Sequence, residues 1–344
     1  MFSELTGNER VKKLLRRLLS SGRIPGALLF SGETGVGKKL FALELARALN
    51  CRNLNGVEGC GKCAVCKRIS HFNFPESDEA EDWTNIIWTD HGDVGLVVAP
   101  KRLLRVNQMR KIESEANFRP FEGRARVFLI DDADRLNEQS SNALLKILEE
   151  PPPTSHVILI TSRPAMLLPT IRSRCQVVRF SPLTADEIER YLVENRLAKG
   201  PEAHLLARYS GGSLGRALKC NLQEYKKHRE VMLQTLRGAA DGNHTQLLRS
   251  AETMNEARYK DDYEFRLDLL ENLIRDVLIL HVGAGDDRVV NDDLLPELND
   301  IASKTDTMRA ANWIAGIEEM REQLVVNINR KVATDSLFLT MASS

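Results

Sequence analysis

The chain has no excess of charge of either sign, because its 48 Lys and Arg residues equal its 48 Asp and Glu residues. A neutral total argues against a protein that holds nucleic acid only by an overall positive field. The sequence also lacks a run of about 18 apolar residues without a charge, which a membrane-spanning helix would need. Charged side chains among the first thirty residues argue against a secretory signal. We therefore expect a cytoplasmic protein with no membrane partner.

Charge is unevenly distributed along the 344 residues. Residues 1–70 contain thirteen basic and five acidic side chains, whereas residues 71–100 contain seven acidic side chains and no Lys or Arg. We expect the acidic segment, residues 71–93, to be a solvated loop, with a docking or DNA-excluding surface as the alternative. A hydrophobic fraction of 42% with 28% charged residues is typical of a globular protein. The length predicts about two or three domains.

Apolar runs and helical patterns alternate through the first half of the chain. Four short apolar runs are typical of buried strands, at 27–30, 127–130, 156–160 and 176–180. Helical spacing separates these runs, so we predict an α/β fold in which a parallel sheet has helices on both faces. Beyond Pro182 only helical spacing continues. The expected domains are an α/β domain at 1–180, a small helical domain at 181–221 and an all-helical domain at 222–344.

The first strand leads into a glycine-rich loop that opens a helix, Gly32-Glu33-Thr34-Gly35-Val36-Gly37-Lys38. A G-x-x-x-x-G-K loop in this position cradles phosphate with backbone N–H groups, and its lysine meets the β and γ phosphates. We expect Gly32, Gly35, Gly37 and Lys38 to contact nucleotide. A glycine-rich turn with an incidental lysine is the alternative.

The residue after this loop departs from the motif. That position normally supplies the hydroxyl that holds Mg²⁺, but here it is Lys39. A protonated ammonium group donates hydrogen bonds and cannot ligate a cation. The sequence therefore argues against Mg²⁺-dependent ATP hydrolysis by this chain, although ATP could still bind.

Two acidic residues follow the apolar run at 127–130 and resemble a Walker B pair. Asp131 would lie near a metal ion at the carboxyl end of the strand. Asp132 stands where a Glu normally polarises the attacking water, and its side chain is one methylene shorter. The alternative is that these carboxylates cap the next helix.

Four of the six cysteines fall within sixteen residues, at Cys51, Cys60, Cys63 and Cys66. In a reducing cytosol this spacing favours a metal site over disulfides. Four thiolates bind Zn²⁺ tetrahedrally at about 2.3 Å, in a closed structural site with no open position for catalysis. We predict a zinc module at 51–66, and an iron–sulfur cluster is the rival.

Longer motifs point to one protein family. Residues 131–136 read Asp-Asp-Ala-Asp-Arg-Leu, and residues 142–152 read Asn-Ala-Leu-Leu-Lys-Ile-Leu-Glu-Glu-Pro-Pro. Ser173-Arg174-Cys175 and Gly212-Ser213-Leu214-Gly215-Arg216-Ala217 follow in order. With the glycine-rich loop and the four cysteines, these motifs make residues 1 to about 220 resemble the AAA+ clamp-loader subunits of bacterial DNA polymerase III. The delta-prime members are most similar, since gamma/tau members keep the Thr that Lys39 replaces.

The resemblance implies a fold and a set of residue roles. It implies an AAA+ P-loop module with an inserted zinc module, then a small helical lid domain and a helical collar that joins the subunits of a hetero-oligomer. Thr161 would occupy the sensor 1 position, and Arg216 the sensor 2 position. Arg174 would act in trans, as an arginine finger on the ATP of a neighbouring subunit.

The resemblance also implies partners and a function. The partners would be the gamma/tau and delta subunits, the sliding clamp and primed DNA, within a DNA-directed DNA polymerase holoenzyme. The function would be to help ATP-dependent loading of the clamp during DNA replication. Two alternatives remain open. One is an active gamma/tau-like ATPase, and the other is a zinc-ribbon DNA-binding protein with a vestigial P-loop, suggested by the basic residues of 1–70.

Overall fold

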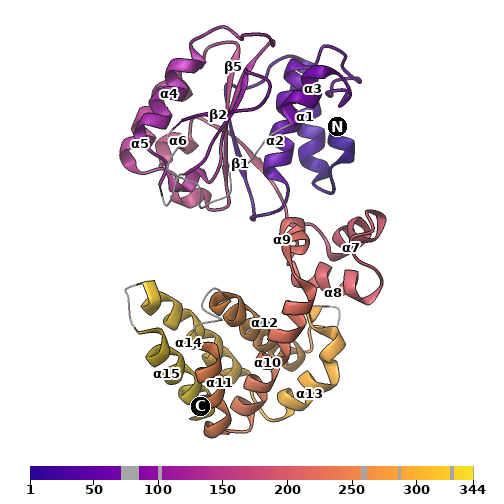
Figure 1. Ribbon diagram of the computed structural model, residues 1–344, viewed down its shortest axis with the longest axis vertical. Helices are drawn as coiled ribbons and strands as arrows, with labels where there is room; N and C mark the ends of the chain where they lie inside the picture. The colour runs from indigo at the N-terminus through magenta and orange to yellow at the C-terminus, as the bar shows by residue number, and fades with distance from the viewer. Residues whose placement is uncertain (71–84, 100–102, 257–261, 286–287, 326–328, 344) are drawn as a thin grey trace. The chain divides into compact units, whose positions relative to one another are not determined.

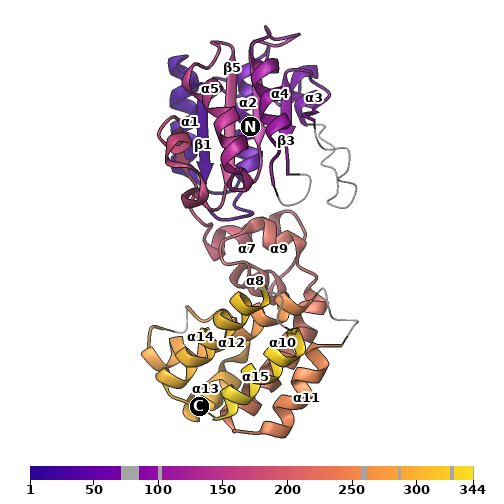
Figure 2. The same ribbon diagram turned by 90° about the vertical axis from the view of Figure 1, so that its left-hand side faces the viewer.

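The computed structural model describes residues 1–70, 85–99, 103–256, 262–285, 288–325 and 329–343. Most of the acidic segment, 71–84, lies outside the described residues. The chain forms two compact units, Met1–Asn195 with Ser210–Leu218, and Arg196–Tyr209 with Lys219–Ser344. The first unit combines a sheet with helices, and the second is helical (Figures 1 and 2). Among the described helices, none is long and apolar enough to cross a bilayer.

The first unit is built on a six-stranded sheet with the order β2-β3-β4-β5-β1-β6. The strands are β1 (Ala27–Ser31), β2 (Ile87–Trp88), β3 (Val94–Val97), β4 (Arg126–Ile130), β5 (Ser155–Thr161) and β6 (Gln176–Arg179). All neighbouring pairs are parallel except β2 and β3. The helices of this unit are α1 (Glu9–Ser21), α2 (Lys38–Asn50), α3 (Ala64–Ser70), α4 (Val106–Ala116), α5 (Glu138–Glu149), α6 (Pro169–Arg172), α7 (Ala185–Glu194) and α9 (Leu214–Lys219).

Each face of the sheet has its own hydrophobic core, because alternate residues of a strand point to opposite faces. On one face, Phe30 of β1 packs in a cluster with Leu15 of α1 and Phe41 of α2. On the other face, Leu29 of β1 packs in a cluster with Leu144 of α5 and residues of α4. Figure 1 shows α1 and α2 on one side of the strands and α4 and α5 on the other. The predicted sheet with flanking helices is confirmed.

The predicted parallel sheet is mixed at one edge. β2 and β3, which are absent from the prediction, pair antiparallel there. β2 has only two residues, and β3 contains Gly95. A Cβ on Gly95 would lie 2.4 Å from Ile86 Cγ2 and 3.1 Å from Trp88 Cε3, so glycine leaves room for these two side chains. The apolar run 94–98 was the available signal for β3.

The second unit contains only helices among its described residues. They are α8 (Pro201–Tyr209), α10 (Leu222–Ala240), α11 (His244–Met254), α12 (Tyr263–Val282), α13 (Leu295–Ser303), α14 (Thr307–Val325) and α15 (Arg330–Ser343). Their core includes Met232, Leu270, Trp313 and Phe338. The helical C-terminal part is therefore confirmed. Residues 181–221 contribute α7 and α9 to the first unit and α8 to the second, and the domain boundaries at 180 and 221 stay predictions.

Asp93, immediately before β3, is fully buried and organises a neighbouring loop. Its carboxylate accepts backbone hydrogen bonds from Phe121, Glu122 and Gly123 at 2.6, 2.9 and 2.7 Å. Asp93→Ala would leave three N–H groups without this acceptor, and each buried unsatisfied group costs about 1–3 kcal/mol. We expect the free energy of unfolding to fall by about 3 kcal/mol or more in urea denaturation. The exposed control Glu194→Ala should change it by less than about 0.5 kcal/mol, and similar losses in both variants would refute the role of Asp93.

Candidate functional site

Three parallel strands bring the residues of the predicted nucleotide site to one edge of the sheet. β1, β4 and β5 are neighbours, and they end at Ser31, Ile130 and Thr161. The glycine-rich loop of residues 32–38, called the phosphate loop below, follows β1 and leads into α2. Asp131 follows β4 directly. Carboxyl ends of parallel strands are where open α/β sheets bind ligands, so the fold places these residues suitably.

The glycines of the phosphate loop are required by its backbone. Gly35 and Gly37 have φ values of 81° and 96°, in the region that side chains rarely tolerate. A Cβ on Gly32 would lie 2.5 Å from the carbonyl oxygen of Phe180. The spacing of glycines in the sequence therefore encodes a tight loop at the start of α2.

Lys38 is turned inward onto the loop itself. Its ammonium donates hydrogen bonds to the carbonyl oxygens of Gly32 and Glu33, both at 2.6 Å. Burial lowers the pKa of Lys38 below its usual value, and the carboxylates of Asp131 and Glu33 oppose that shift. The group predicted to meet the β and γ phosphates is thus bound to two main-chain carbonyls.

Lys39 forms an ion pair with Asp131 across the loop. Lys39 Nζ lies 2.5 Å from Asp131 Oδ2, and both side chains are partly buried. In the standard motif the residue at the position of Lys39 has a hydroxyl that binds Mg²⁺. The residue at the position of Asp131 supplies a carboxylate that helps to hold the same ion. The ammonium group therefore neutralises the carboxylate that a metal ion would otherwise need.

A segment near the start of α9 packs directly on the phosphate loop. Gly215 N donates to the carbonyl oxygen of Gly35 at 2.9 Å. A Cβ on Gly35 would lie 2.2 Å from Ser213 Oγ. Arg216, the residue predicted for the sensor 2 position, is exposed, and its backbone N–H donates to Ser213 Oγ at 3.1 Å. Within the Gly212 to Ala217 motif, sequence reasoning assigned a role to Arg216 and none to Ser213 or Gly215, although the second glycine of the motif was an available signal.

The acidic residues after β4 are held by other side chains. Asp132 has a left-handed backbone with φ 46° and pairs with Arg135 at 3.2 Å. Thr161 Oγ1 donates to Asp134 Oδ1 at 2.6 Å, and Arg163 Nη2 donates to Asp134 Oδ2 at 2.7 Å. Burial alone would raise the pKa of Asp134, but these hydrogen bonds outweigh it and lower that pKa. The Thr161 hydroxyl therefore donates to Asp134, a residue of the 131–136 motif to which sequence reasoning assigned no role.

Arg174 lies just after α6 and is about one third exposed. Its Nη2 pairs with Glu149 Oε1 at 2.7 Å, and its Nη1 donates to the carbonyl oxygen of Thr170 at 3.0 Å. Glu149 is the last residue of α5 and belongs to the long motif at 142–152. The guanidinium is thus positioned at the surface by two contacts within this chain.

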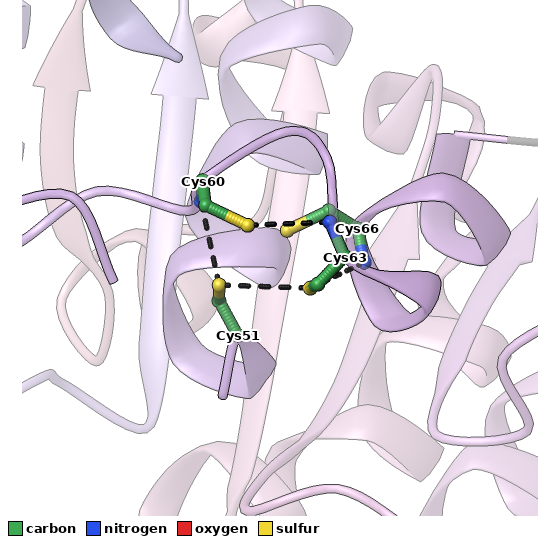
Figure 3. Close-up of side chains that lie close together, drawn as sticks. All are labelled: Cys51, Cys60, Cys63 and Cys66. Carbon is green, nitrogen blue, oxygen red and sulfur yellow. Dashed lines mark hydrogen bonds between the residues drawn. The ribbon is translucent and has the colours of Figure 1, made fainter. Parts of the chain in front are cut away.

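The four cysteines of the predicted zinc module converge (Figure 3). Cys51 caps the end of α2, Cys66 lies in α3, and Cys60 and Cys63 lie in the connection between them. All four sulfur atoms lie within 4.8 Å of one another. Cys51 Sγ and Cys63 Sγ are 3.8 Å apart. A single ion with four tetrahedral bonds of about 2.3 Å would hold its sulfurs about 3.8 Å apart, so the cluster fits one such ion.

Main-chain donors also favour thiolates in this cluster. Backbone N–H groups of Cys60, Cys63 and Cys66 donate to the sulfurs of Cys51, Cys60 and Cys63 at 3.3, 3.3 and 3.4 Å. Backbone hydrogen bonds from Lys62 and Cys63 lower the pKa of Cys60 to about 6. Burial raises the pKa of Cys51 and Cys66, so these thiols need a cation to become thiolates at neutral pH.

Comparison with known proteins gives the family. A family model described as DNA polymerase III, delta subunit, matches residues 7–184, and a second model, for the C-terminal part of the delta subunit, matches residues 223–341. The chain belongs to this DNA polymerase III family. A delta-prime subunit of DNA polymerase III from Bacillus subtilis strain 168 is 28% identical over 333 residues. The match covers 96% of this chain and 95% of the Bacillus protein.

Tau subunits of DNA polymerase III are similar over a smaller share of the chain. The tau subunit of Escherichia coli strain K12 is 36% identical over 222 residues, 63% of this chain and 32% of the relative, so the match spans about a third of that protein. A crystal structure of a gamma-subunit-related protein from Thermotoga maritima matches 97% of this chain and 98% of its own, with 15% identity and a TM-score of 0.42. The predicted resemblance to delta-prime and gamma/tau subunits is confirmed by the family and sequence matches.

Proposed function

We propose that this chain is the delta-prime-like subunit of a DNA polymerase III clamp loader. It would assemble with gamma/tau and delta subunits and help ATP-dependent loading of the sliding clamp onto primed DNA. Similarity to a delta-prime subunit along nearly the whole length supports this assignment, since the tau match covers only 63% of the chain.

The observation that carries the proposal is the Lys39–Asp131 ion pair. It supports a subunit that does not hydrolyse ATP, because the ammonium group takes the place of the metal ion that phosphoryl transfer needs. Bound Mg²⁺ would neutralise charge on the β and γ phosphates. In this chain Lys38 and Lys39 would supply positive charge there, provided that Lys38 leaves the carbonyls of Gly32 and Glu33.

Arg174 is proposed as a finger for the ATP site of a neighbouring subunit. Its ion pair with Glu149 is partly exposed, and exposed pairs contribute only about 0–1 kcal/mol. Exchanging Glu149 for a phosphate oxygen would therefore cost little. A guanidinium delivered in this way stabilises the charge that develops on the transferred phosphoryl group.

Zinc is proposed as the ion of the cysteine cluster. Cys51, Cys60, Cys63 and Cys66 supply four soft ligands and leave no position for substrate, so the ion would have a structural role. An iron–sulfur cluster would distribute the four thiolates over two or more irons. The compact arrangement of the sulfurs favours one ion.

Assembly tests the proposal directly. The purified chain, mixed with gamma/tau and delta subunits, should co-elute with them as one complex in size-exclusion chromatography. Separate elution of the wild-type chain under conditions in which the other subunits associate would refute the assignment.

The isolated chain should show no Mg²⁺-dependent ATP hydrolysis. Lys39→Thr would restore the metal-binding hydroxyl and release Asp131, so nucleotide binding to this variant should become dependent on Mg²⁺. Release of phosphate from ATP and fluorescence of a labelled nucleotide measure the two properties. Substantial turnover by the wild-type chain would instead favour the gamma/tau-like ATPase, which the intact glycines and Lys38 would support.

A further inference from the structure

A loop between α4 and β4 presents two phenylalanine rings to solvent. This aromatic loop, residues 117–123, contains Phe118 and Phe121, which are 59% and 87% exposed. The two rings border an open groove of about 680 Å³. The groove is also lined by Trp88, Gly92, Glu115, Arg119 and Arg126. Exposed rings gathered at one groove are typical of interaction sites rather than of ordinary loops.

The backbone of the aromatic loop is held firmly. The buried carboxylate of Asp93 accepts the N–H groups of Phe121, Glu122 and Gly123. A Cβ on Gly123 would lie 2.2 Å from Asn50 Oδ1, so the loop packs closely on the end of α2. A rigid loop loses little conformational entropy when it binds, which makes its exposed rings effective anchors.

Residues next to two of the cysteines hold this loop and the two residues that follow it. Arg68 in α3, two residues after Cys66, donates to both oxygens of Glu122 at 2.9 and 2.6 Å. Asn50, the residue before Cys51, accepts the N–H groups of Arg124 and Ala125 at 2.9 and 3.0 Å. An ion that fixes Cys51 and Cys66 would therefore also fix the two supports of the aromatic loop.

The charges around the groove identify the kind of partner. Arg126 donates to the carbonyl oxygen and carboxylate of Glu115 at 2.7 and 3.1 Å, and it lies 5.0 Å from the Trp88 ring centroid. Glu122 is paired with Arg68. Within the described part of the chain, no ion pair or hydrogen bond involves the guanidinium of Arg119. One available cation at the groove, on a residue between Phe118 and Phe121 in the sequence, matches one carboxylate, whereas a nucleic-acid backbone requires a row of cations.

We propose that the aromatic loop docks a protein partner whose surface carries a carboxylate flanked by apolar side chains. Phe118 and Phe121 would insert between the apolar side chains, and Arg119 would pair with the carboxylate. Aromatic residues and arginine are enriched in such interfaces. The inference rests on the proposed function, because the partner is expected among the proteins of the same assembly.

Binding of three purified proteins to the immobilised full-length chain tests this proposal. The probes are gamma/tau, delta and the sliding clamp, and a primed DNA oligonucleotide is measured in parallel. Phe121→Ala should weaken binding of one of the three proteins about thirtyfold, and Arg119→Glu at least about tenfold, with DNA binding unchanged. The control Val193→Ala, an exposed apolar residue on α7, should bind within about twofold of the wild type.

The outcomes separate this inference from the proposed function. If the wild type binds its partners and both loop variants bind them equally well, the docking surface is refuted. Loss of DNA binding alone would refute it in favour of a base-stacking surface. If the wild type binds none of the three proteins, both the proposed function and this inference fail. Arg68→Met keeps both rings but removes their support, so it should weaken the same binding several-fold, and unchanged binding would refute the supporting role of α3.

Discussion

Arg174→Ala should reduce DNA-stimulated ATP hydrolysis by the assembled clamp loader at least about tenfold, while the assembly itself stays intact. An arginine finger raises the rate of phosphoryl transfer about 10³- to 10⁵-fold at the active site to which it is supplied. We expect the loss to occur in a neighbouring subunit, because we propose that Lys39, paired with Asp131, replaces Mg²⁺ in this chain. Steady-state phosphate release with clamp and primed DNA present measures it.

Arg172→Ala is the matched control for this experiment. Arg172 is exposed at the end of α6, two residues before Arg174, so it reports on a general loss of positive charge at this surface. It should leave hydrolysis within about twofold of the wild type, as exposed substitutions usually do. Equal losses in both variants would assign the effect to charge alone, and unchanged hydrolysis by Arg174→Ala would refute the finger role.

Cys60→Ser should lower the zinc content of the purified protein from one ion per chain to nearly none. Removing one of four thiolates opens the closed site, and structural zinc sites contribute about 10–16 kcal/mol of apparent binding free energy in zinc-finger peptides. Because the cluster connects α2 to α3, we expect a large fall in the melting temperature of the variant and of wild-type protein treated with a chelator. Metal analysis and thermal unfolding followed by circular dichroism provide the two readouts.

Cys220→Ala is the control for this experiment, because it removes a thiol that does not belong to the cluster. Cys220 is half-buried and lies outside the group of four sulfurs. This variant should retain one zinc per chain. Iron with visible absorption in the purified protein would establish the rival cluster, and absence of any bound metal would contradict a metal site.

Much of the first unit could be predicted because its signals are local in sequence. Four apolar runs predicted β1, β4, β5 and β6, and the short spacing of the cysteines predicted the cluster. β2 and β3 were missed because one has two residues and the other is interrupted by Gly95. At that edge Ile86 and Trp88 pack over Gly95, a contact that spacing along the chain does not encode.

The partners of the candidate site residues could not be predicted for the same reason. Lys39 was recognisable as incompatible with Mg²⁺, but its contact with Asp131 depends on the position of β4 relative to the phosphate loop. Similarly, Ser213 reaches Gly35 only because the segment before α9 packs against the phosphate loop within the first unit. The aromatic loop depends on Asp93, which is 28 residues away from Phe121. These contacts follow from tertiary packing rather than from residue type.

ATP-dependent loading of the sliding clamp onto primed DNA, measured with and without this chain, decides whether the chain is a working part of a clamp loader. We expect efficient loading by an assembly of gamma/tau, delta and this chain. Omission of the chain should abolish loading, although gamma/tau retains its own ATP sites. Equal loading rates with and without the chain would contradict its assignment to the clamp loader.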